Sequence, residues 1–233
     1  MERSRKGRPP RGARKDRRPA PPPPLAREVV EDIRAAAGGK SNRAVALVEE
    51  AVAALDRERL GDAIRAAQQA KALAARSGAV REVLGMALYR KGSFREALRE
   101  LQAYRRLTGR PDQNHLIADS YRALGSPEKA LPLVREALDA RIGAEARAEA
   151  AVVGGSALAD LGRYQEALTL LRRFDRAGDS SHPYDLRVWY VTGDVLERAG
   201  RVKEAARAFQ RVVDHNPEAF DAAERLSALG ERR

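Results

Sequence analysis

Apolar residues recur along most of the chain three or four positions apart, and polar residues fill the positions between them. Two such stretches flank Gly92, the first at Val83, Leu84, Ala87 and Leu88 and the second at Phe94, Ala97, Leu98 and Leu101. This pattern predicts two amphipathic helices separated by a turn. A single helix pair leaves one apolar face uncovered, so we expect neighbouring copies to cover it.

The pattern is repeated. A glycine stands five residues before an alanine in RKGSFREALREL (90–101), RALGSPEKALPLV (122–134), ADLGRYQEALTLL (159–171) and ERAGRVKEAARAF (197–209). With Ala63 as a weaker first copy, the alanines are 34, 33, 37 and 38 residues apart, at Ala63, Ala97, Ala130, Ala167 and Ala205. A period of this size indicates a helical solenoid.

The units resemble tetratricopeptide repeats, in which small and large residues alternate at fixed places around a turn glycine. The last copy matches best, at Trp189, Gly193, Leu196, Gly200, Ala205, Phe209 and Pro217. Earlier copies match at Leu84, Gly85, Leu88, Gly92 and Ala97, at Ala118, Tyr121, Gly125, Ala130 and Ala137, and at Gly155, Leu158, Gly162 and Ala167. The chain departs from the pattern at Glu58, which replaces the first turn glycine, and at Arg81, Tyr104, Asn114 and Phe174.

The resemblance implies an all-α fold, a right-handed superhelical solenoid of about five helix pairs. The repeats are expected at about 44–77, 78–110, 111–147, 148–185 and 186–219, with a lead-in helix at 25–40 and a capping helix at 218–229. The two longer spacings predict extra residues after the second helices of the third and fourth units. The latter insertion, at about 176–185, contains glycine, serine and proline and is expected to be an exposed, mobile loop.

Composition supports a soluble helical protein. Apolar residues make up 43% of the chain and aromatic residues only 5%, which favours helices over strands. The absence of cysteine excludes disulfides, thiolate metal sites and a cysteine nucleophile. No apolar run approaches the ~20 residues that cross a bilayer, and prolines follow the basic N-terminus where a signal sequence would be apolar. We therefore expect a cytoplasmic protein without a membrane partner.

The positive charge is concentrated at the N-terminus. Of the net charge of +11, residues 1–24 carry +7, from nine basic and two acidic residues, and the other 209 residues carry +4. The same segment holds seven of the twelve prolines, which predicts a disordered basic arm. Such an arm could bind a polyanion through Arg3, Arg5, Lys6, Arg8, Arg11, Arg14, Lys15, Arg17 and Arg18. A solvated tail that aids solubility is the alternative.

Catalytic and cofactor motifs are missing from the sequence. His115, His182 and His215 are scattered, and neither HExxH, GxSxG nor GxxxxGK[ST] occurs. Gly154 and Gly155 precede Ser156 inside a predicted helix, where small residues fit a helix crossing better than a phosphate loop. We predict no catalytic residue, no metal and no cofactor.

The resemblance implies recognition instead, since the first helices of such repeats line a concave groove that takes an extended peptide or a partner helix. The family's groove positions fall on Val48, Val52, Glu82, Met86, Tyr89, Arg90, His115, Asp119, Arg122, Val152, Ser156, Arg187, Tyr190 and Asp194. Asp119 and Asp194 stand where family members that grip a terminal carboxylate have asparagine, and they would repel a carboxylate. This argues against an adaptor for chaperone tails.

The sequence thus predicts a non-catalytic scaffold that binds a protein or peptide in its groove. The alternative is an RNA- or ribosome-associated protein that docks through the basic arm. The sequence specifies neither the partner nor the oligomeric state.

Overall fold

The computed structural model describes residues 24–175 and 183–231, and in these ranges the chain is helical without a β-strand. The α-helices are α1 (Arg27–Ala37), α2 (Ser41–Asp56), α3 (Leu60–Leu73), α4 (Gly78–Arg90), α5 (Phe94–Thr108), α6 (Asn114–Ala123), α7 (Ala130–Asp139), α8 (Ala144–Asp160), α9 (Tyr164–Arg172), α10 (Pro183–Arg198), α11 (Val202–His215) and α12 (Ala222–Glu231). Short 3-10 turns precede α2 and α7, at Gly38–Lys40 and Pro127–Lys129.

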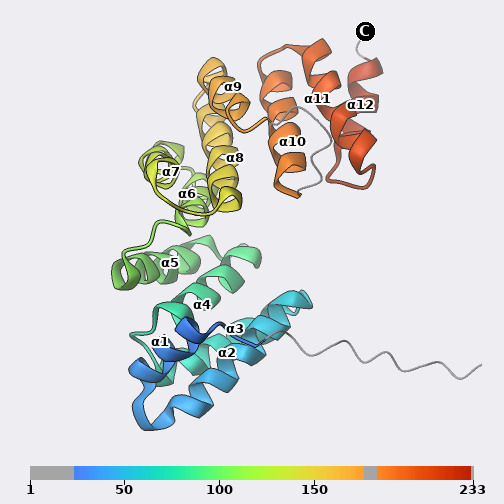
Figure 1. Cartoon of the computed structure of the whole chain (residues 1–233). Helices are drawn as coiled ribbons and strands as arrows, with labels where there is room; N and C mark the ends of the chain where they lie inside the picture. The colour runs from blue at the N-terminus through green and yellow to red at the C-terminus, as the bar shows by residue number, and fades with distance from the viewer. Residues whose placement is uncertain (1–23, 176–182, 232–233) are drawn as a thin grey trace, which may run out of the picture.

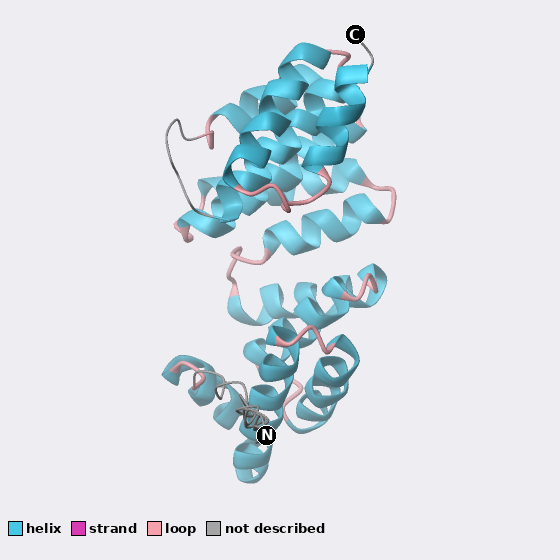
Figure 2. Ribbon diagram, turned by 90° about the vertical axis from the view of Figure 1, so that its right-hand side faces the viewer, coloured by secondary structure: helices cyan, strands magenta, loops and turns pink. Residues whose placement is uncertain are grey.

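The helices pack as five antiparallel pairs in a curved row, which Figure 1 shows from blue at the bottom to red at the top. The pairs are α2 with α3, α4 with α5, α6 with α7, α8 with α9 and α10 with α11. The first helix of each pair packs against the preceding pair, and α12 covers α11. Figure 2 shows the same stack from the side. The prediction of an all-α solenoid is confirmed.

The turn inside each pair explains why the glycine recurs. Gly92, Gly125, Gly162 and Gly200 have φ angles of 78°, 75°, 73° and 73°, in the left-handed region that only glycine enters without strain. Glu58 occupies the same place in the first pair with a φ of 55°. The first unit therefore forms the same turn with a residue that tolerates it poorly.

Small residues stand where the helices of neighbouring elements approach most closely. The repeat alanines at 63, 97, 130, 167 and 205 are all fully buried. A Cβ atom built on Gly155 would lie 2.9 Å from Leu171, and one on Gly154 would lie 2.7 Å from Val134 and 2.8 Å from Leu170. This supports the assignment of the Gly154–Ser156 segment to a helix crossing.

The lead-in helix α1 packs on the first helices α2 and α4. Ile33 is fully buried in a cluster with Val48 and Val80, and the Asp32 carboxylate accepts hydrogen bonds from the Ser77 hydroxyl at 2.5 Å and the Ala79 amide at 3.0 Å. Asp32 thus satisfies free amide groups at the start of α4. As a result, α1 covers the first-helix face at the N-terminal end of the solenoid.

Two predicted boundaries differ from the structure. Helix α10 begins at Pro183, three residues before the expected start of the fifth unit, and Asp185 is buried in it. Proline is favoured in the first turn of a helix, which the sequence interpretation overlooked. The remainder of the expected loop, 176–182, lies outside the described residues. The second difference concerns the spacing of 37 residues between Ala130 and Ala167. The extra residues lie in the first helix α8, which has 17 residues where α4 has 13, and not after the second helix α7 as expected.

Arginine side chains link consecutive first helices near their C-terminal ends. Arg90 donates to the Leu55 carbonyl at 3.2 Å, and Arg198 donates to the Ala159 carbonyl at 2.9 Å. Asp160 accepts from Arg122 of the preceding first helix at 3.1 Å and from Arg198 of the following one at 3.0 Å. We use the name arginine staples for Arg90, Arg122, Arg198 and Asp160, together with the carbonyl groups of Leu55 and Ala159.

Candidate functional site

A pocket of about 360 Å³ opens between the first helices of the last three pairs. Helices α6, α8 and α10 form its walls, and the segment between α11 and α12 closes one side. We call it the Tyr190 pocket, and its lining residues are Asp119, Arg122, Val152, Val153, Ser156, Arg187, Tyr190, Val191, Asp194, Arg198 and Phe220.

The charged residues at the rim of the Tyr190 pocket are already paired with one another or with neighbours. Arg122 bonds to Asp119 at 2.9 Å, and Arg187 lies 3.2 Å from Glu149. Arg225 bonds to Asp194 at 2.9 Å. The rest of the lining consists of three valines, Ser156 and two aromatic rings. The pocket therefore offers an apolar hollow surrounded by neutralised charge.

Two aromatic rings form the side of the pocket near the C-terminus. The Phe220 ring is 4.7 Å from the Tyr190 ring, and the Tyr190 hydroxyl donates to Asp221 at 2.5 Å. Phe220 is 52% exposed and has a φ of 56°, an unfavourable backbone conformation for a bulky residue. An exposed ring held on a strained backbone is a feature typical of functional surfaces.

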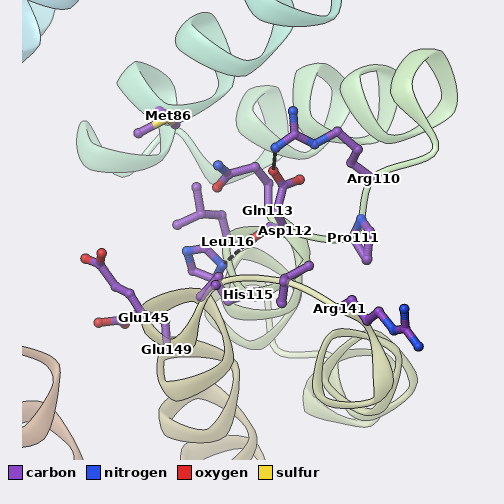
Figure 3. A pocket seen from close by; sticks show the side chains of 13 residues that line it. Met86, Arg110, Pro111, Asp112, Gln113, His115, Leu116, Arg141, Glu145 and Glu149 are labelled. Carbon is purple, nitrogen blue, oxygen red and sulfur yellow. Dashed lines mark hydrogen bonds and ion pairs between the residues drawn. The ribbon is translucent and has the colours of Figure 1, made fainter. Parts of the chain in front are cut away.

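A second pocket of about 630 Å³ lies between α4, α6 and α8, next to the first along the solenoid. Figure 3 shows its lining side chains, which surround His115. We call it the His115 pocket, and it is lined by Met86, Arg110, Pro111, Asp112, Gln113, His115, Leu116, Arg141, Ile142, Gly143, Glu145, Ala146 and Glu149.

Carboxylates dominate one wall of the His115 pocket. Glu145 and Glu149 lie one turn apart on α8 and come from the same side of that helix in Figure 3. Burial raises the pKa of Glu149 above its ordinary value, although Arg187 opposes the shift. Burial also lowers the pKa of His115, whose Nδ1 lies 3.0 Å from the Asp112 carbonyl. The Arg110 guanidinium is held 2.6 Å from Asp112, and Arg141 points away from the pocket.

The structure brings half of the fourteen predicted groove residues together. Seven of them line the Tyr190 pocket, namely Asp119, Arg122, Val152, Ser156, Arg187, Tyr190 and Asp194. Two, Met86 and His115, line the His115 pocket. The other predicted positions bind neighbouring parts of the chain: Glu82 accepts from Gln113 at 2.7 Å, Tyr89 donates to Asp119 at 2.5 Å, and Arg90 belongs to the arginine staples.

Some predicted roles change. Val48 is fully buried under α1, so it offers nothing to a ligand, and Val52 is half-buried beside the same cluster. Asp119 and Asp194 each have an arginine partner, which weakens the expected repulsion of a carboxylate. The nine basic residues predicted for polyanion binding lie outside the described residues.

The sequence interpretation missed Glu145, Glu149 and Phe220. The two glutamates share a helix face with Val152, at spacings of seven and three residues, so extending the groove pattern toward the start of α8 would have found them. Phe220 is in a loop and has no periodic signal.

Within residues 24–175 and 183–231, no cluster of three or more His, Asp or Glu side chains could hold a metal ion. In the same ranges no helix is long and apolar enough to cross a membrane.

Comparison with known proteins finds one matching sequence family and several solved structures with a similar fold. Residues 116–223 match the family described as tetratrico peptide repeat. No curated protein matches the sequence. Among solved structures, a thermophilic TPR protein of Thermus thermophilus, TTC0263, shares the fold with a TM-score of 0.65 and 16% identity, over 80% of this chain and 98% of that one.

Two further structures show the same fold. YrrB, described as a TPR protein with an unusual peptide-binding site, has a TM-score of 0.55 and 19% identity, over 84% of this chain and 97% of that one. The apo form of the quorum sensor NprR from B. thuringiensis has a TM-score of 0.67 and 15% identity, over 88% of this chain and 63% of that one. Residues 116–223 carry the sequence pattern of the tetratrico peptide repeat family, and the earlier helix pairs continue the same fold.

Proposed function

We propose that the protein is a non-catalytic interaction scaffold that binds a peptide segment of a partner protein in the Tyr190 pocket. The fold supports protein–protein interaction in general, and the pocket supports this narrower role. The main support for peptide binding is that Phe220, an exposed aromatic residue on a strained backbone, lines an apolar hollow.

The chemistry of the pocket favours an apolar side chain of the peptide. Three valines line the hollow, and the Tyr190 and Phe220 rings can cover a bound side chain. Large aromatic side chains at the centre of an interface contribute much of its binding energy. Arg187 at the rim can bond to peptide carbonyls without leaving Glu149, since a guanidinium has five donors. The structure of YrrB, with the same fold and a peptide-binding site in its description, is consistent with this role.

Selection of random-sequence peptides on the full chain tests the proposal. Phe220→Ala should lower the affinity for the selected peptides about tenfold or more, because it removes one wall of the pocket. Leu107→Ala is the matched control, since Leu107 is also an exposed large apolar residue, at 44%, and lies on the second helix α5. If the selected peptides bind both variants as tightly as they bind the unchanged protein, the pocket is not the binding site.

Docking of RNA or the ribosome through residues 1–24 is the second candidate, supported by the charge of that segment alone. Capture of partners with and without nuclease separates the two functions. Partners that survive nuclease and are lost in Phe220→Ala support the scaffold, whereas partners lost on nuclease treatment support nucleic-acid docking.

A further inference from the structure

The His115 pocket differs from the Tyr190 pocket in chemistry. Its lining includes Met86, Leu116 and Ile142, all half-buried, and α8 contributes Glu145 and Glu149. Apolar side chains in the same pocket as carboxylates suit a lysine or arginine side chain, whose methylene groups pack on the apolar surface while the charged end reaches an acid.

The carboxylates of this wall are only partly compensated. Glu149 is 14% exposed and has Arg187 at 3.2 Å, yet burial still raises its pKa. Glu145 is exposed beside it and raises the pKa of Glu149 further. An additional cation between the two carboxylates would therefore be favourable. Of the two arginines that line the pocket, Arg110 is held by Asp112 and Arg141 points away from the pocket.

The chain itself supplies a cationic segment at the correct face of the solenoid. Residues 1–24 carry nine basic side chains and lead directly into α1, which packs on the first helices α2 and α4. Helix α4 also contributes Met86 to the pocket. An extended segment of this length reaches ~80 Å, whereas adjacent helices are ~10 Å apart, so the pocket is within easy reach.

We propose that the chain's own basic arm, residues 1–24, docks in the His115 pocket with a lysine or arginine side chain against Glu145 and Glu149. Because the arm is tethered, its effective concentration at the pocket is of the order of millimolar, so even a weak contact is occupied. Docking there places the arm beside the Tyr190 pocket. This inference needs no external partner and is independent of the proposed peptide binding.

A spin label on the arm tests the proposal in the full chain. The sequence has no cysteine, so Ala13→Cys accepts a single nitroxide. We expect the label to broaden the amide signals of Met86, Leu116 and Ala146 more than those of α3 and α11. The effect should be lost in about 1 M salt, where the screening length is about 3 Å. Equal broadening of all helices, or broadening centred on another surface, would overturn the proposal.

Charge variants separate specific docking from general attraction. In the Glu145→Gln/Glu149→Gln protein the broadening at the pocket should disappear. The matched control is Glu128→Gln/Glu224→Gln, which removes the same charge from exposed positions on other elements and should keep the broadening. Identical behaviour of both double variants would contradict the proposal.

Neutralising the arm provides a test that does not depend on the stability of the pocket variants. Arg14→Gln/Lys15→Gln/Arg17→Gln should reduce the broadening without changing any contact of the described helices. Mixing spin-labelled and isotope-labelled copies shows which chain supplies the arm. If the broadening in the mixture is as strong as in the protein that carries both labels on one chain, the arm comes from a second copy and docking within one chain is overturned.

Discussion

Replacing Gly154 by alanine tests the close packing of α7, α8 and α9. In an open helix this change stabilises by about 1 kcal/mol, because alanine is the better helix former. At Gly154 the new methyl group would meet Val134 at 2.7 Å and Leu170 at 2.8 Å. Overpacking of this kind costs about 1–3 kcal/mol, and the upper half of the range applies because Val134 is stiff about its first side-chain torsion.

The net effect should be a loss of about 1–2 kcal/mol, which lowers Tm by about 3–6 °C in a chain of this size. Gly61→Ala is the matched control, since Gly61 lies in α3 with nothing within 4 Å of its Cβ position. It should raise Tm by about 2 °C. Both proteins are melted under circular dichroism at 222 nm. A rise in Tm for both variants would refute the packing described at the α7–α8–α9 crossing.

Four further outcomes are expected. Ala167→Leu should cost about 1–3 kcal/mol in a denaturant titration, because Ala167 is fully buried between helices; unchanged stability would mean a wrong repeat register. Glu58→Gly should raise the free energy of unfolding by up to about 1 kcal/mol, since relief of the left-handed strain exceeds the value of an exposed ion pair with Arg90. Burial lowers the pKa of His115 below 6.5, so stability is lost as the pH falls through that value, and His115→Gln should flatten this loss in melts from neutral to acidic pH. RNA binding by residues 1–24, if present, should fall steeply with salt in a filter-binding assay and disappear when their nine cations are replaced by glutamine; salt-insensitive binding would exclude it.

The stack of helix pairs could be predicted from the sequence because its signals are local. A glycine that must adopt positive φ and an alanine that must fit a crossing recur in each unit, and even the exception at Glu58 forms the same turn. The start of α10 was misplaced because proline was read as a loop residue, although it suits the first turn of a helix.

The pockets were less accessible to sequence reasoning. The groove residues of α6, α8 and α10 follow from helical spacing, and their approach in the Tyr190 pocket was therefore predictable. The His115 pocket also depends on the segments 109–113 and 141–143, whose positions are set by tertiary packing rather than by any periodic pattern. Likewise, the burial of Val48 depends on where α1 docks, which spacing alone does not specify.

The arginine staples couple the movements of neighbouring helix pairs. Arg90, Arg122 and Arg198 join first helices near their C-terminal ends, and Asp160 is shared between two of them. The opposite ends are also joined, by the Arg187–Glu149 ion pair and by the hydrogen bond from Gln113 to Glu82. Because Asp160 bonds to both Arg122 and Arg198, a displacement of α6 is passed on to α10 through one carboxylate. The last three helix pairs should therefore change their curvature as one unit.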